Sequence, residues 1–483
     1  MKGQAAVTWR ARPDRVLRAS LGEAHVVGMV FAPPLGVALA ESAWPLAAVL
    51  GLAILPPLAG AALAIRYPAP RDLRQIEAVA VLVLLFLGTA ALAAPAFVTL
   101  GMTPVDAVFE SVSGITSTGL TLAQGTTEWP LAGHVLRAWM QWCGGFAIAL
   151  AGVALILGPG SSRGAASSLG RAGLNERDIL SSTRAQARAL LLAYSVLTAA
   201  AVLVFLPLFP SWWEGLLIAL TAVSTGGFTP RADSLASYSR AAQGAALLVC
   251  LASAFSLMFY VRVRRDGLRA AFFGTNAAAM VGFALGVATA AAVLRLATGG
   301  DAAAVLDSLF NMLSAVTTAG FSVAPVVEAP PLLALMLGAM LVGGGAGSTA
   351  GGLKLERALT LARAVRLALL RLRVPPEAVT PLMANGARMQ QRRLVATVAI
   401  VALYAATALL CWMALLAGGV PALPALYDTI SALSTVGLSA GAVTPDLSWP
   451  LKLVLTVAML LGRLEFLALI AVVLPATWAP RHK

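Results

Sequence analysis

The sequence predicts an all-helical protein that crosses a membrane many times, and three observations lead to this prediction. Of the 483 residues, 59% are hydrophobic and only 11% are charged, whereas soluble domains carry roughly 25% charged residues. Long apolar stretches recur along the chain, and each is long enough to cross a hydrocarbon core about 30 Å thick. Between them lie four short segments that align with one another without a gap. Together these features predict four repeats of helix, pore hairpin and helix in a pseudo-fourfold arrangement around one pore.

The apolar stretches define the expected spans in chain order. The first, 26–40, is short and contains Pro33 and Pro34, so we expect a thin or kinked span. A cleaved signal peptide is not expected, because Asp14 and Glu23 precede this stretch and many further apolar stretches follow it. The longer stretches run from Trp44 to Ile65, Ala78 to Leu100, Leu131 to Leu157, Ala189 to Phe209, Ala241 to Val261, Phe272 to Leu294, Pro331 to Leu370, Leu394 to Ala417 and Leu451 to Ala476.

The net charge of +13 is explained by orientation in the membrane. If the chain begins inside, the inner segments hold 28 of the 34 Lys and Arg, together with nine acidic residues. The outer segments hold five basic residues against eleven acidic ones. This is the positive-inside bias, and it predicts a cytoplasmic N-terminus. A nucleic-acid partner is not expected, because that role needs basic residues clustered on a folded soluble module.

The four aligned segments are the most informative feature of the chain. Segments one to four begin at Asp106, Glu214, Asp307 and Pro424, and each ends with Gly followed by Leu or Phe. They are too short to cross the bilayer and are typical of re-entrant elements. Each combines about ten residues of helical character with a tail of small and hydroxyl-bearing residues. Ordinary outer connections could account for one such copy but not for four at equivalent positions.

The four tails are the candidate ion-binding residues. Irregular backbone at membrane depth must be buried in protein or line a water-filled path. Four extended tails around one axis would turn carbonyl and hydroxyl oxygens inward, in place of an ion's hydration shell. The candidate residues are Thr116, Ser117, Thr118 and Gly119; Ser224, Thr225, Gly226 and Gly227; Thr317, Thr318, Ala319 and Gly320; and Ser434, Thr435, Val436 and Gly437.

The helical part of each segment gives a second reason to expect a cation. A short helix that enters from outside directs its partially negative C-terminus toward the membrane centre. Acidic residues suit its outer N-terminus, and Asp106, Glu214 and Asp307 occupy that same position in three segments. We expect these acids also to concentrate cations at the outer mouth.

Two further features lie in the spans. Six glycines fall within ten residues from Gly343 to Gly352, and each costs a helix interior about 1 kcal/mol relative to Ala, so the helix should break there. Packing of small residues between helices is the alternative explanation; a phosphate loop is disfavoured because no Lys stands before Ser348. Arg463 lies within the last apolar stretch. Charged residues at such depth usually face a water path, so we expect Arg463 to act as an electrostatic barrier below the tails. A purely structural pairing with Asp, Glu or carbonyls elsewhere is the alternative.

These patterns resemble the TrkH/KtrB/HKT superfamily of potassium transporters, and most closely its bacterial TrkH branch. Besides the four tails, the resemblance is carried by QWCGG at 141–145, GGGAGSTAGGLK at 343–354 and GRLEF at 462–466. The first tail has Thr-Ser-Thr-Gly where Thr-Thr-Thr-Gly is common, and the second has Ser-Thr-Gly-Gly where Asn-Asn-Ala-Gly is frequent. Both keep the glycine that marks a preference for potassium.

The resemblance implies a potassium uptake protein of the bacterial inner membrane with an additional N-terminal helix pair. It implies that the glycine-rich loop obstructs the pore, that the protein is a homodimer, and that a cytoplasmic nucleotide-binding ring of the TrkA type regulates it. The basic residues from Arg357 to Arg393 would contact that ring or anionic lipid. The candidate gate residues are Gly343, Gly344, Gly345, Gly347, Ser348, Thr349, Gly351, Gly352 and Arg463. The expected division is an N-terminal pair at 1–76 and four repeats at 77–162, 163–270, 271–386 and 387–483.

Other functions remain to be separated. A K⁺/H⁺ or K⁺/Na⁺ symporter on the same fold is the main alternative, and an ammonium channel is another, since carbonyl rings do not by themselves identify their ion. An enzyme is not expected, because no cluster of His, Asp and Glu appears. Cys143, Cys250 and Cys411 lack the spacing of a metal site or a disulfide framework. The only bound species expected is K⁺ as the transported ion.

Overall fold

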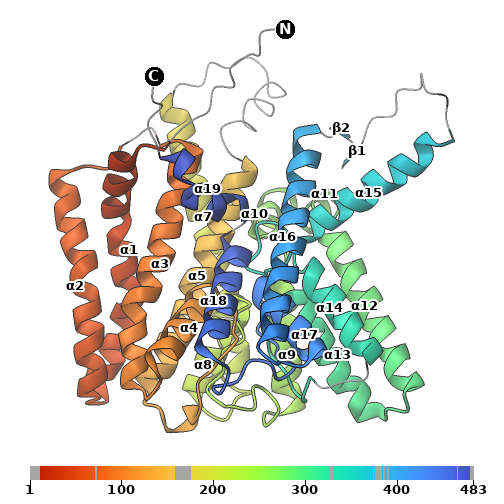
Figure 1. The fold of residues 1–483 in the computed structure, drawn as a ribbon, viewed down its shortest axis with the longest axis horizontal. Coiled ribbons are helices and arrows are strands. Elements are labelled where there is room, and N and C mark those ends of the chain that lie inside the picture. Colours follow the sequence, from red (N-terminus) through yellow and green to blue (C-terminus); the bar gives the residue numbers. More distant parts are fainter. Residues whose placement is uncertain are drawn as a thin grey trace.

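The structure is a computed structural model that describes residues 11–70, 73–157, 176–326, 330–373, 375, 383–384, 387–388, 391–464 and 466–478. The described residues form a bundle of α-helices, as predicted (Figure 1). One pair of two-residue antiparallel strands, β1 (Met383–Ala384) and β2 (Ala387–Arg388), is the exception among them. Six of the described helices are long and apolar enough to cross a membrane, or seven if one bent pair is counted as a single span.

Two long helices form a pair at the N-terminal end of the bundle. They are α1 (Pro13–Ala40) and α2 (Trp44–Arg66), and they pack along each other. The expectation of a short first span is wrong, because α1 has 28 residues and continues through Pro33 and Pro34. Its first half carries charged residues, which conceal the helix from a search for apolar runs.

Each of the four segments forms a short pore helix between longer elements. In Figure 1 these pore helices lie in the lower half of the view. They are α4 (Pro104–Ile115), α8 (Trp212–Val223), α13 (Ala302–Thr317) and α17 (Ala422–Leu433). The helices before them are α3 (Gln75–Thr99), α7 (Glu176–Phe205), α12 (Ala277–Ala297) and α16 (Gln391–Ala417). The remaining short elements are η1 (Thr126–Glu128), α11 (Leu268–Gly274) and η2 (Pro475–Thr477).

The element that follows each pore helix is continuous in one case and broken in three. After segment one, α5 (Leu131–Leu157) is a single helix. After segment three, the chain breaks between α14 (Pro330–Val342) and α15 (Leu355–Arg371), as the glycines predict. Two further breaks were not expected: α9 (Arg240–Ser253) and α10 (Leu257–Asp266) meet at 79°, and α18 (Trp449–Arg463) is followed by α19 (Phe466–Val473).

The packing of these helices closes a ring. The helix after each pore helix contacts the next pore helix, so α5 packs on α8, α9 on α13 and α14 on α17. The last helix, α18, packs back on α4. Large apolar side chains on the outer helices face away from this core, including Leu52 on α2, Leu285 on α12 and Leu410 on α16, each more than 60% exposed. An apolar outer surface of this kind suits contact with lipid.

Candidate functional site: a ring of four re-entrant tails

The four tails share one backbone conformation. In every tail the second residue has a left-handed φ near 50°, and these residues are Ser117, Thr225, Thr318 and Thr435. The fourth residue is the glycine, with φ of 91°, 80°, 75° and 96° in segments one to four. A left-handed conformation costs a residue with a side chain about 1–2 kcal/mol. Its recurrence at four equivalent positions shows that the pore helices all end in the same way.

Repeated hydrogen bonds fix this conformation. In segment one, the Ser117 N–H donates to the carbonyl of Gly114 (3.0 Å) and the Thr118 N–H to that of Ser113 (2.9 Å). The corresponding pairs occur in the other segments: Thr225 to Ala222 and Gly226 to Thr221, Thr318 to Ala315 and Ala319 to Ser314, Thr435 to Ala432 and Val436 to Ser431. This is the Schellman arrangement that ends a helix at a left-handed residue.

The glycines bring the four tails into contact in a closed order. A Cβ atom on Gly119 would overlap the carbonyl oxygen of Gly226 in segment two. In the same way, Gly227 lies against Ala319 of segment three, Gly320 against Val436 of segment four, and Gly437 against Thr118 of segment one. Each glycine is therefore required twice, by its positive φ and by the neighbouring carbonyl. The structure brings all four predicted tails together.

Several hydroxyl groups of the tails bond to the surrounding protein. Ser117 Oγ donates to the carbonyl of Gln141 (2.8 Å), and Thr318 Oγ1 accepts from the N–H of Gly351 (2.6 Å). Ser434 Oγ pairs with the hydroxyl of Tyr404 (2.6 Å). The expectation that hydroxyl oxygens turn inward is therefore not met for these three residues. Backbone carbonyls remain the oxygens that every tail can offer at the ring.

The glycine-rich loop contacts the inner ends of the tails. The N–H of Gly352 donates to the carbonyl of Ser434 (3.0 Å), the N–H of Gly351 reaches segment three through Thr318, and Thr349 Oγ1 donates to the carbonyl of Val223 at the end of α8 (3.0 Å). Left-handed φ values at Gly343, Gly347 and Gly352 give the loop its folded path. The loop is thus tied to three of the four pore-helix ends.

Arg463 lies beside this loop, at the end of α18. Its Nη1 donates to the carbonyl of Thr349 (2.8 Å), and the side chain is buried. Its Nε and Nη2 atoms have no partner among the described residues. Glu465, which shares the sequence motif, lies outside the described residues. The expectation that Arg463 lies near the Gly343 loop agrees with this geometry.

The acids at the pore-helix N-termini are ion-paired. Asp106 pairs with Lys452 (2.5 Å), Glu214 with Arg231 (2.9 Å), and Asp307 with Arg240. A fourth acid, Glu110 on α4, pairs with Arg137 (3.0 Å). The hydrogen-bonded Glu214 carboxylate raises the pKa of Arg231, which lies in the outer loop. The expectation that these acids attract cations at the mouth is therefore weakened, because each has its charge balanced by a basic neighbour.

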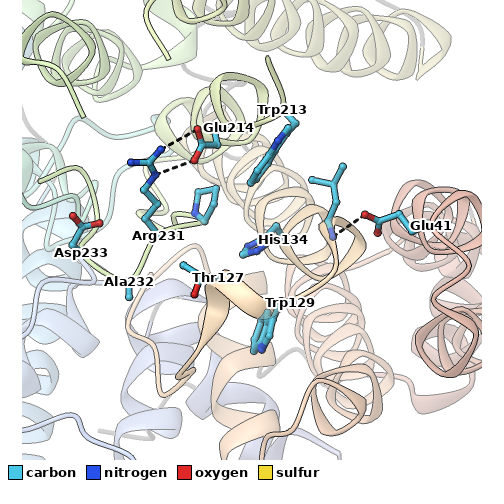
Figure 2. Close-up of a pocket in the computed structure, with 11 residues that line it drawn as sticks. Glu41, Thr127, Trp129, His134, Trp213, Glu214, Arg231, Ala232 and Asp233 are labelled. Carbon is cyan, nitrogen blue, oxygen red and sulfur yellow. Dashed lines mark hydrogen bonds and ion pairs between the residues drawn. The ribbon is translucent and has the colours of Figure 1, made fainter. Parts of the chain in front are cut away.

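A cavity of about 810 Å³ lies between α5 and α8, and none of the tail residues lines it (Figure 2). His134 stands between Trp129 and Trp213, with ring centroids 6.2 Å and 6.0 Å away. Glu41 accepts the N–H groups of Leu131 and Ala132 at the start of α5. Among the described residues no group of three or more His, Cys, Asp and Glu could hold a metal ion.

Sequence reasoning did not assign the role of three side chains that hold the chain beyond the tails. Glu110, Asn311 and Asp428 each lie nine residues before the glycine of their segment. Each accepts the N–H of the third residue after that glycine: Leu122 (3.2 Å), Val323 (3.1 Å) and Ala440 (2.6 Å). The alignment of the four segments could have indicated this role, because three of the four have a polar residue at this position.

Comparison with known proteins agrees with this architecture. The TrkH family, described as cation transport protein, matches residues 75–299 and 270–477. The Trk system potassium uptake protein TrkH of Halomonas elongata is 30% identical over 78% of this chain and 80% of its own length. That of Escherichia coli K12 is 28% identical over the same shares. An uncharacterized cation transporter of Methanocaldococcus jannaschii is 27% identical over 75% of this chain and 74% of its own.

A solved structure has the same fold. The crystal structure of the potassium transporter TrkH from Vibrio parahaemolyticus superposes with a TM-score of 0.85 at 24% identity, covering 97% of this chain and all of that one. At this identity the likeness concerns the fold alone. The family match covers more than half of the chain, and the ring of four tails stands within it. The chain therefore belongs to the TrkH family of cation transport proteins.

Proposed function

We propose that this protein takes up potassium ions across the bacterial inner membrane through the ring of four tails. The closed contact of Gly119, Gly227, Gly320 and Gly437 with successive carbonyls carries this proposal. It brings four equivalent backbone strands to one place, where their carbonyl oxygens can replace the hydration shell of a cation. The names of the Halomonas and Escherichia relatives support K⁺ as the transported ion. All sixteen tail residues form the proposed filter.

The glycine-rich loop and Arg463 form the proposed gate. Hydrogen bonds to segments two, three and four support a position directly below the filter. The buried guanidinium of Arg463 adds a positive charge beside the loop, which raises the energy of a cation there. The loop consists mainly of glycine, so it can change its backbone path at low steric cost.

The proposed assembly follows from the resemblance described above. It is a homodimer with one pore in each protomer, an N-terminal helix pair at 1–76, and four repeats at 77–162, 163–270, 271–386 and 387–483. The N-terminus lies in the cytoplasm. A TrkA-type ring binds the cytoplasmic face, and α15 supports this through Arg357, Arg363 and Arg366. Part of the basic stretch ending at Arg393 lies outside the described residues.

Substitution of Gly119 by Ser tests the filter. The added side chain would overlap the Gly226 carbonyl, and the positive φ at this position would strain the serine backbone. Selectivity for K⁺ over Na⁺ should therefore fall by at least about tenfold, the factor that corresponds to ~1.4 kcal/mol. Wild-type protein should rescue growth of a transport-deficient bacterium in low potassium. Unchanged selectivity in Gly119→Ser would remove the filter assignment.

Reversal potentials measured in a pH or Na⁺ gradient would separate gated conduction from symport.

A further inference from the structure

Segment two differs from the other three in how the chain beyond its filter is held. Glu110, Asn311 and Asp428 carry out this task from within their own pore helices. The equivalent residue of segment two is Ile218, which has no polar atom in its side chain. The residue that corresponds to Leu122, Val323 and Ala440 is Pro230, which has no N–H to donate. The strand of segment two is held at a different point.

Gln141 of α5 holds this strand next to its glycine. Its Oε1 accepts the N–H of Phe228 (3.1 Å), and its Nε2 donates to the carbonyl of Gly226 (2.6 Å). The side chain is completely buried. The two partners lie on either side of Gly227, and only one orientation of the carboxamide satisfies both. Gln141 thus holds the segment-two strand from the helix that follows segment one.

The neighbouring glycine leaves the space that this side chain occupies. Segment two has Gly226 where the other tails have Thr118, Ala319 and Val436. A Cβ on Gly226 would overlap the carboxamide of Gln141. The departure of the second tail from its counterparts is therefore explained by the glutamine, and the two residues form a matched pair.

The same residue also contacts segment one. The backbone carbonyl of Gln141 accepts the hydroxyl of Ser117 (2.8 Å), so Gln141 bridges two adjacent filter strands. Gly226 is also the residue whose carbonyl lies against Gly119. Among the described residues, the carbonyls of Thr118, Ala319 and Val436 receive no such side-chain donor. The carbonyl of segment two is thus held by a side-chain amide.

We propose that Gln141 is a positioning residue that sets the ion selectivity of the filter by fixing the carbonyl of Gly226. This rests on the proposed function, because it assigns a role within the same potassium filter. Loss of the carboxamide releases the Gly226 carbonyl and leaves the Phe228 N–H unpaired. A released strand can adapt to a smaller ion, so discrimination against Na⁺ decreases.

The test compares Gln141→Met with Gln141→Glu in purified protein reconstituted into vesicles. Met preserves length but makes neither hydrogen bond, and K⁺ flux should persist while the K⁺/Na⁺ permeability ratio falls roughly tenfold. Glu keeps the acceptor for Phe228 but loses the donor to Gly226, and it should also lower the ratio. Gln243→Met is the matched control, because Gln243 is a buried glutamine that donates to the carbonyls of Leu235 and Tyr238 in the outer loop. It should keep the wild-type ratio.

A second pair of variants guards against a folding defect. Gly226→Ala alone should disrupt the filter because of the overlap, whereas Gly226→Ala combined with Gln141→Ala removes the overlap and should recover K⁺ flux with reduced selectivity. A wild-type ratio in Gln141→Met, with Gly119→Ser still impaired, overturns the role of Gln141 but leaves the filter assignment intact. A wild-type ratio in Gly119→Ser overturns both.

Discussion

Among the described residues, the buried Arg463 makes one hydrogen bond, to the carbonyl of Thr349 in the glycine-rich loop. Burial of a charge without full pairing is costly, and the described residues leave two of its guanidinium nitrogens without a partner. Its position suits a group that acts on a passing ion or on the loop.

Replacement of Arg463 by Gln should raise K⁺ flux roughly tenfold or more. A positive charge near contact distance costs a cation about 1–4 kcal/mol, depending on the local dielectric, and Gln removes that cost while retaining a donor for Thr349. Flux of K⁺ into vesicles measures the effect. Arg463→Lys is the control, since it keeps the charge and should conduct like the wild type. Equal flux in wild type and Arg463→Gln would exclude a barrier role.

Individual residues also mark where sequence reasoning succeeded and where it could not. The tails were predicted because Ser, Thr and Gly recur at fixed spacing. The outward bonds of Ser117 and Ser434 were not, because their partners, Gln141 and Tyr404, lie 24 and 30 residues away. Spacing within a repeat contains no information about contacts between helices.

At the scale of elements, the break between α14 and α15 follows from local composition, whereas the bend between α9 and α10 does not. No Gly or Pro lies between Ser253 and Leu257. Instead the loop stabilises the bend, since Gly345 N–H donates to the Ala254 carbonyl and Leu257 N–H to that of Gly347, at 3.1 Å and 3.0 Å. Contacts with a distant element therefore stabilise this break. The local sequence contributes Ser256, whose hydroxyl accepts the Met258 N–H as the N-cap of α10.

Substitution of Gly351 by Ala should dislodge the loop and increase K⁺ flux in the absence of a regulatory partner. The added Cβ would overlap the carbonyl of Ser434, so the loop can no longer seat below segment four. Gly338→Ala in α14 is the matched control: nothing lies within 4 Å of its Cβ position, and it should stabilise the helix by up to about 1 kcal/mol with unchanged flux. Similar flux in the two variants would contradict a gating role for the loop.

At the scale of the whole molecule, ion pairs connect neighbouring parts of the ring. Lys452 on α18 pairs with Asp106 on α4, and so closes the last segment onto the first. Arg240 on α9 similarly pairs with Asp307 on α13. His134 has the same spacing from its glycine as Lys452, yet Glu214 pairs with Arg231 instead. The charge count predicted the acidic outer surface but not which residues form ion pairs. The paired residues lie as many as 346 positions apart in the sequence, and only the folded ring brings them together.

The Asp106–Lys452 pair should stabilise closure of the ring. Its side chains are 9% and 7% exposed, and removal of one partner from a buried pair costs about 3–5 kcal/mol because the other charge stays unpaired. Lys452→Met should therefore lower the unfolding temperature of the purified protein clearly, and the double variant Asp106→Asn, Lys452→Met should recover part of that loss. The exposed pair Arg265–Asp266, at 79% and 35%, provides the control, and Arg265→Met should unfold like the wild type. If Lys452→Met and Arg265→Met unfold at the same temperature, closure does not depend on this pair and rests on the packing of α18 against α4 alone.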